Sequence, residues 1–140
     1  MKQSGWKPVT EKEAEKEILE SLRDAGLMAF HMDTTINGFP DILAMGSGVA
    51  LVEMKCHDYS GDKSLNDIME PSQPVFMDNA ARHGFSRTYL CVFDGKSYSL
   101  YGTFHILAST MAGRSLGDLV ALLVGAGPED VARFIMEEIK

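Results

Sequence analysis

The sequence predicts a single mixed α/β (α+β) domain of 140 residues. Three observations support this prediction. Residues 11–25 repeat apolar side chains at the spacing of a helix, and residues 42–56 contain two apolar runs separated by three small residues. A second helical segment over 72–83 is followed by a short apolar run over 88–93. The expected order is therefore helix, three strands, helix, strand.

The composition is that of a soluble globular protein, with 45% hydrophobic and 24% charged residues. No run approaches the ~20 apolar residues of a membrane span, and the first ten residues lack the apolar core of a signal peptide. We therefore expect a cytoplasmic protein, of a bacterium or a phage-infected cell, or one associated with the nucleoid. Cys56 and Cys91 lie in apolar runs and suit reduced, buried thiols. The scattered histidines and cysteines make a zinc site unexpected.

The first helix is expected over 11–25. Thr10 followed by Glu13 is a capping-box pattern, and Gly26 is a stop signal. The apolar stripe of this helix is Ala14, Ile18, Leu19 and Leu22. A first strand is expected over 27–32, followed by a polar loop over 33–39.

A hairpin is expected next, with strands over 42–45 and 49–56 and a loop in which Gly48 takes the left-handed position. In this register Asp41 lies opposite Glu53. Because side chains alternate along a strand, Asp41, Glu53 and Lys55 share one face. The apolar Val49 and Leu51 share that face too, which indicates a strand covered on both sides.

Residues 57–71 are polar and are expected to form a long loop, in which Lys63 could contact a phosphate backbone. The next helix opens at 72–74 with proline in its first turn, and Gly84 ends it. We expect its packed face to consist of five side chains: Val75, Phe76, Asn79, Ala80 and His83.

A buried strand is expected over 88–93. The Asp94-Gly95 pair predicts a hairpin that returns over 96–101 as an edge strand. Two amphipathic helices are expected over 115–124 and 128–139, either covering the sheet or forming a dimer contact. The core thus spans 11–93, and a C-terminal extension spans 94–140.

Opposed carboxylates at Asp41 and Glu53 would have Cβ atoms roughly 5 Å apart and would repel each other. A divalent cation between them removes this conflict. Mg²⁺ takes oxygen ligands and commonly uses one or two carboxylates with water and substrate phosphate. Lys55 beside it could orient a water or stabilise negative charge. The alternative is an ordinary turn at Asp41 and an ion pair between Glu53 and Lys55, but buried carboxylates are costly without a metal or partner.

Pro40, Asp41, Glu53 and Lys55 form a pattern that resembles the signature of the PD-(D/E)XK nuclease superfamily. By length and spacing, the chain is most similar to virus-type replication-repair nuclease (VRR-NUC) domains and archaeal Holliday-junction resolvases. The resemblance covers residues 11–93. It implies a restriction-endonuclease-like core, with a mixed sheet flanked by helices.

The resemblance also implies an activity, that of a Mg²⁺-dependent endonuclease in which Mn²⁺ can replace Mg²⁺. Asp41, Glu53 and the backbone carbonyl of Met54 would hold the metal, with Lys55 helping to activate water. A glutamate from the first helix often joins such sites. Glu15 is our choice, with Glu11 and Glu13 behind it.

Gln73, at the start of the second helix, resembles a glutamine of these families. It would orient the water or a phosphate, or else simply cap its helix. The implied substrate is branched DNA such as a four-way junction, and the implied assembly is a homodimer.

Two other functions stay open. One is a phage-type or restriction-type nuclease acting on linear or flap DNA. The other is a non-catalytic scaffold that binds DNA or protein, against which the complete set of Asp41, Glu53 and Lys55 argues. The net charge of −7 counts against strong non-specific DNA binding, but metal ions and helix N-termini can also meet phosphates.

Overall fold

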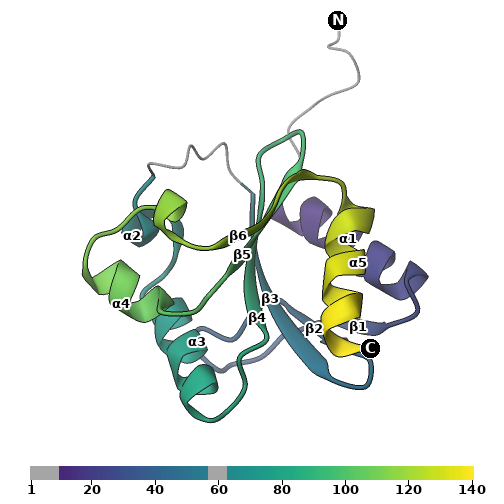
Figure 1. The fold of residues 1–140 in the computed structure, drawn as a ribbon, viewed down its shortest axis with the longest axis horizontal. Coiled ribbons are helices and arrows are strands. Elements are labelled where there is room, and N and C mark those ends of the chain that lie inside the picture. Colours follow the sequence, from purple (N-terminus) through teal and green to yellow (C-terminus); the bar gives the residue numbers. More distant parts are fainter. Residues whose placement is uncertain (1–9, 57–62) are drawn as a thin grey trace, which may run out of the picture.

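The computed structural model describes residues 10–56 and 63–140 (Figure 1). Within them the chain forms five α-helices, one short 3₁₀-helix and six strands. The helices are α1 (Glu11–Asp24), α2 (Leu65–Ile68), α3 (Ser72–Arg82), α4 (Ile106–Met111) and α5 (Pro128–Ile139), with η1 (Leu116–Asp118). The strands are β1 (Met28–His31), β2 (Ile42–Met45), β3 (Val49–Cys56), β4 (Thr88–Phe93), β5 (Tyr98–Gly102) and β6 (Ala121–Ala126).

The six strands form one sheet in the order β1-β2-β3-β4-β5-β6. Every neighbouring pair is antiparallel except β3 and β4, which run parallel and are joined by a crossover that contains α2 and α3. The predicted mixed sheet and the predicted order of the core elements are therefore confirmed.

Helices cover both faces of the sheet, α1 and α5 on one side and α2, α3 and α4 on the other (Figure 1). Each side has its own apolar cluster. The first includes Ile18 and Leu22 of α1, Val52 of β3 and Ile135 of α5. The second joins α2, α3 and α4 to the opposite side of β4, through residues such as Leu90. Strand β3 is therefore covered on both sides, as its sequence predicted.

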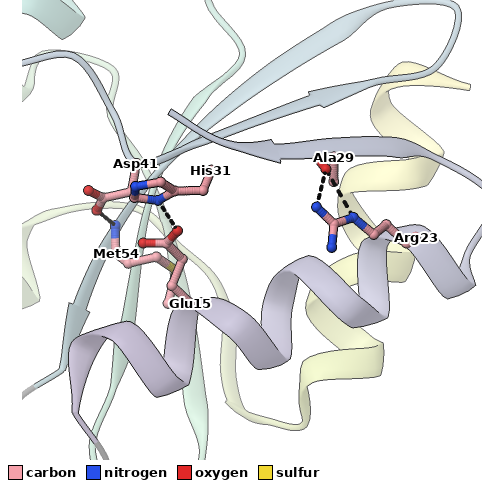
Figure 2. A network of polar contacts seen from close by, with 6 residues as sticks. All are labelled: Glu15, Arg23, Ala29, His31, Asp41 and Met54. Atoms are coloured by element: carbon pink, nitrogen blue, oxygen red, sulfur yellow. Dashed lines mark hydrogen bonds and ion pairs between the residues drawn. The ribbon is translucent and has the colours of Figure 1, made fainter. Parts of the chain in front are cut away.

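Helix α1 begins as predicted. Thr10 and Glu13 form the reciprocal capping box, and the helix ends one residue earlier than expected. Its hydrogen bonds then fix it to the sheet. The hydroxyl of Tyr98 donates to Glu17, and the guanidinium of Arg23 donates twice to the carbonyl of Ala29 on β1, over 3.0 and 2.8 Å (Figure 2).

The hairpin of β2 and β3 has the predicted bounds and register, with Met45 opposite Val49 and Ile42 opposite Val52. The prediction for Gly48 was wrong, because its φ is not in the left-handed region. The loop instead needs glycine for space. A Cβ at Gly46 would lie 2.6 Å from the carbonyl oxygen of Ile139, and the N–H of Gly48 donates to that same oxygen over 2.8 Å.

The expected loop over 57–71 is interrupted by structure. Residues 57–62 lie outside the described residues, but α2 forms within the remainder, capped by the Ser64 side chain. The packed face of α3 was also assigned wrongly. Pro74 and Met77 are buried, whereas Val75, Asn79 and His83 are exposed, because α3 packs against α4 rather than directly along the sheet.

The C-terminal extension differs most from prediction. The helix expected over 115–124 is instead η1 followed by strand β6, which pairs with β5. Strand β5 is therefore an interior strand rather than an edge strand, while the helix over 128–139 is confirmed as α5. Among the described residues, no helix is long and apolar enough to cross a membrane.

Candidate active site

The predicted site residues of the hairpin lie where β2 begins and where β3 is buried. Glu53 is 2% exposed and Lys55 9% exposed, although both carry charged groups. Asp41 immediately precedes β2 and lies one residue beyond the pair Ile42 and Val52. If the same register is continued, Asp41 lies opposite Glu53. Directly opposed residues leave the same face of a sheet. The three predicted residues therefore share one region of one face.

Pro40 lies just beyond the last residue pair of the hairpin ladder. In continued register it would lie opposite Met54, but proline has no N–H to donate. The N–H of Met54 instead donates to Oδ2 of Asp41 over 2.9 Å (Figure 2). This bond fixes the Asp41 carboxylate, and the Met54 carbonyl receives no ladder bond from Pro40.

The two oxygens of Glu53 have different surroundings. Nε2 of Gln73 donates to Oε2 over 2.9 Å, and Nζ of Lys55 lies 3.5 Å from the same oxygen. The other oxygen, Oε1, is buried and has no hydrogen-bond partner in the described part of the chain. An unpaired buried carboxylate oxygen is costly, and a cation bound to it would offset that cost.

Burial and, after it, the nearby Asp41 carboxylate together raise the pKa of Glu53 to about 9, against the opposing effect of Lys55. Without a bound cation, Glu53 is therefore a neutral acid at pH 7. A cation placed between the two carboxyl groups would reverse this balance, because it stabilises the ionised form.

The backbone just before α3 holds the Gln73 side chain by a second contact. Its Oε1 accepts from the backbone N–H of Glu70 over 3.0 Å. The loop that leads to Asp41 packs against the same turn. A Cβ at Gly38, where φ is +81°, would lie 2.1 Å from the carbonyl oxygen of Ser72. Only glycine fits there, so the loop before Asp41 and the first turn of α3 are fixed together.

Glu15 lies near this group but has another partner. Its carboxylate is hydrogen-bonded to Nδ1 of His31 on β1 (Figure 2), and its pKa is raised by burial, with His31 opposing the shift. Glu11 is coupled to the site more directly. Burial raises its pKa and so does Asp41, whereas Lys55 and the backbone of Cys56 lower it. Sequence reasoning placed Glu11 and Glu13 behind Glu15 because Glu15 lies towards the packed side of the helix, and the position of Lys55 relative to α1 depends on the fold.

The donor set suits a hard cation. Within residues 10–56 and 63–140, no three His, Cys, Asp or Glu side chains form a metal-binding group. A cation could instead be held by the carboxylates of Asp41 and Glu53 and the carbonyl of Met54, with water or substrate oxygens completing its shell. The unpaired Oε1 of Glu53 and the raised pKa of this residue fit such an ion.

The fold is that of a restriction-endonuclease-like domain, with one carboxylate just before β2 and a second carboxylate and a lysine on β3. Among solved structures, the chain is similar to Hjc, a Holliday junction resolvase from the archaeal hyperthermophile Archaeoglobus fulgidus. The TM-score is 0.53 at 17% sequence identity, over 86% of this chain and 98% of that chain. This likeness confirms the predicted fold class. No protein-family model and no curated protein matches the sequence, and the resemblance to VRR-NUC domains stays a prediction.

Proposed function

We propose that this protein is a divalent-metal-dependent endonuclease that hydrolyses phosphodiester bonds of branched DNA as a homodimer. The observation that supports it best is Glu53, a carboxyl group buried in a central strand with one unpaired oxygen, next to Asp41 and Lys55. Such an arrangement costs stability unless a cation or a hydrogen-bond donor compensates it. A non-catalytic scaffold would have no reason to keep it.

In this proposal Asp41, Glu53 and the Met54 carbonyl hold Mg²⁺ or Mn²⁺. A bound divalent ion polarises a phosphate oxygen and lowers the pKa of a coordinated water. Met54 N–H keeps Oδ2 of Asp41 in position, and Gln73 does the same for Oε2 of Glu53. Lys55 is the cation next to the carboxylates. It orients the attacking water and stabilises negative charge that develops on the phosphate.

The choice of substrate rests on the neighbouring structure, whose protein is a Holliday junction resolvase. A two-fold symmetric dimer suits the two symmetric cuts that resolution of a four-way junction requires. A nuclease acting on linear or flap DNA would use the same residues. Comparing cleavage of different DNA structures distinguishes a junction resolvase from a nuclease of linear or flap DNA.

The test is a cleavage assay on a four-way junction, a flap, a linear duplex and a single strand, with Mg²⁺, Mn²⁺, Ca²⁺ or EDTA. We expect cleavage of the junction with Mg²⁺ or Mn²⁺, and none with EDTA or Ca²⁺ alone. Asp41→Asn should abolish cleavage and Mg²⁺ binding together, whereas Lys55→Ala should lose turnover and keep Mg²⁺ binding. Glu20→Gln, an exposed carboxyl on α1, is the matched control. Full activity in EDTA would refute the proposal, and a preference for the flap or duplex would change the substrate.

A further inference from the structure

We propose that Gln73 determines which metal the site accepts, by leaving Glu53 only one oxygen with which to bind it. This inference rests on the proposed metal site and adds a residue that sets its selectivity. It follows from the contacts at the two ends of the Gln73 amide.

The orientation of the Gln73 amide is fixed at both ends. Its oxygen faces a backbone N–H, that of Glu70, which can only donate. Its nitrogen must then be the atom that faces Oε2 of Glu53, where it donates. The backbone of Gln73 lies in the first turn of α3, which packs against Gly38, and the two hydrogen bonds of its amide hold the donor at Glu53.

This contact makes the oxygens of Glu53 unequal. The Gln73 amide nitrogen lies 2.9 Å from Oε2, within normal hydrogen-bond range, whereas Nζ of Lys55 is 3.5 Å away. Gln73 is therefore the closer donor. Only Oε1 is left without a partner in the described residues, so Glu53 offers a cation one oxygen rather than two.

Cations differ in how well they accept a single oxygen. Mg²⁺ requires six ligands close to octahedral positions and keeps several waters, so one oxygen from each carboxylate suits it. Ca²⁺ takes six to eight oxygens and often binds a carboxylate through both. By occupying Oε2, Gln73 favours Mg²⁺ and withholds from Ca²⁺ the second oxygen that it would use.

The experiment is calorimetric titration of the full chain with MgCl₂ and with CaCl₂ at one pH, without DNA. We compare wild type with Gln73→Met, which keeps the volume and removes the donor. The affinity for Ca²⁺ relative to Mg²⁺ should rise about tenfold, as expected for losing one hydrogen bond to a charged group. Asn79→Ala removes an exposed amide from the same helix and should leave the ratio unchanged.

Gln73→Ala provides a second variant with higher helix propensity, in case the methionine variant folds poorly. A ratio that stays at the wild-type value in the folded variant would overturn the role of Gln73, even if both affinities fall together. Wild type that binds neither ion, or Glu53→Gln that binds Mg²⁺ as wild type does, would instead overturn the metal site itself. The two failures are therefore distinguishable.

Discussion

Replacing Glu53 by glutamine should stabilise the metal-free protein, and the gain should grow with pH. The amide has nearly the same shape as the carboxyl group but cannot ionise. In the folded wild type the pKa of Glu53 is raised from 4.5 to about 9, chiefly by burial. Between these values the unfolded chain has lost the proton while the folded chain keeps it, so the stability of the wild type falls as the pH rises.

The size of the effect follows from the shift. Each pH unit inside this window costs the wild type about 1.4 kcal/mol relative to a variant without the titrating group. Between pH 5 and pH 7, the advantage of Glu53→Gln should therefore grow by roughly 3 kcal/mol. That is a large share of the 5–15 kcal/mol that stabilises a typical domain.

Urea denaturation in EDTA at pH 5, 6, 7 and 8 measures this difference directly. Glu20→Gln, exposed on α1, is the control, and its difference from wild type should stay constant. If the unfolding free energies of wild type and Glu53→Gln run parallel across this range, Glu53 is ionised in the folded protein and our account of its environment is wrong. Adding Mg²⁺ should reverse the order of stability, because only wild type binds it well.

Two more predictions follow. Mg²⁺ binding should release close to one proton at pH 7, and the apparent Mg²⁺ affinity should increase with pH until about 9, because Glu53 must ionise to bind the ion. Calorimetry in buffers of different ionisation enthalpy measures the number of protons released. Zero proton release would contradict this prediction. Gly46→Ala should destabilise the protein by about 1–3 kcal/mol, because its Cβ would lie 2.6 Å from the Ile139 carbonyl oxygen. Ser47→Asn is the control and should be nearly neutral. Equal denaturation midpoints for the two variants would show that α5 moves aside.

Elements with strong local signals were predictable from the sequence. The capping box at Thr10 fixes where α1 begins, and two apolar runs around a small loop fix the hairpin and its register. Since register decides which side chains share a face, the grouping of Asp41, Glu53 and Lys55 could be derived from the sequence alone.

Elements that depend on distant neighbours were not predictable. Residues 121–126 are apolar enough to suit a helix or a strand, and only pairing with β5 makes them a strand. The sequence also suggested that the glycines of the 46–48 loop serve the turn itself. In the structure they leave space for the backbone of Ile139, from the far end of the chain. The hydrogen bond from Gln73 to Glu53 has the same origin, since 20 residues separate the two in sequence.

The contact between Arg23 and the carbonyl of Ala29 has a consequence for association between molecules. Strands β1 and β6 are the two edges of the sheet, and an edge strand can recruit a strand from another molecule. On β1 that carbonyl is already occupied by the Arg23 guanidinium, so an incoming strand would first have to displace a charged group. Fibre growth requires two free edges on every molecule. The Arg23 contact therefore disfavours growth through the β1 edge.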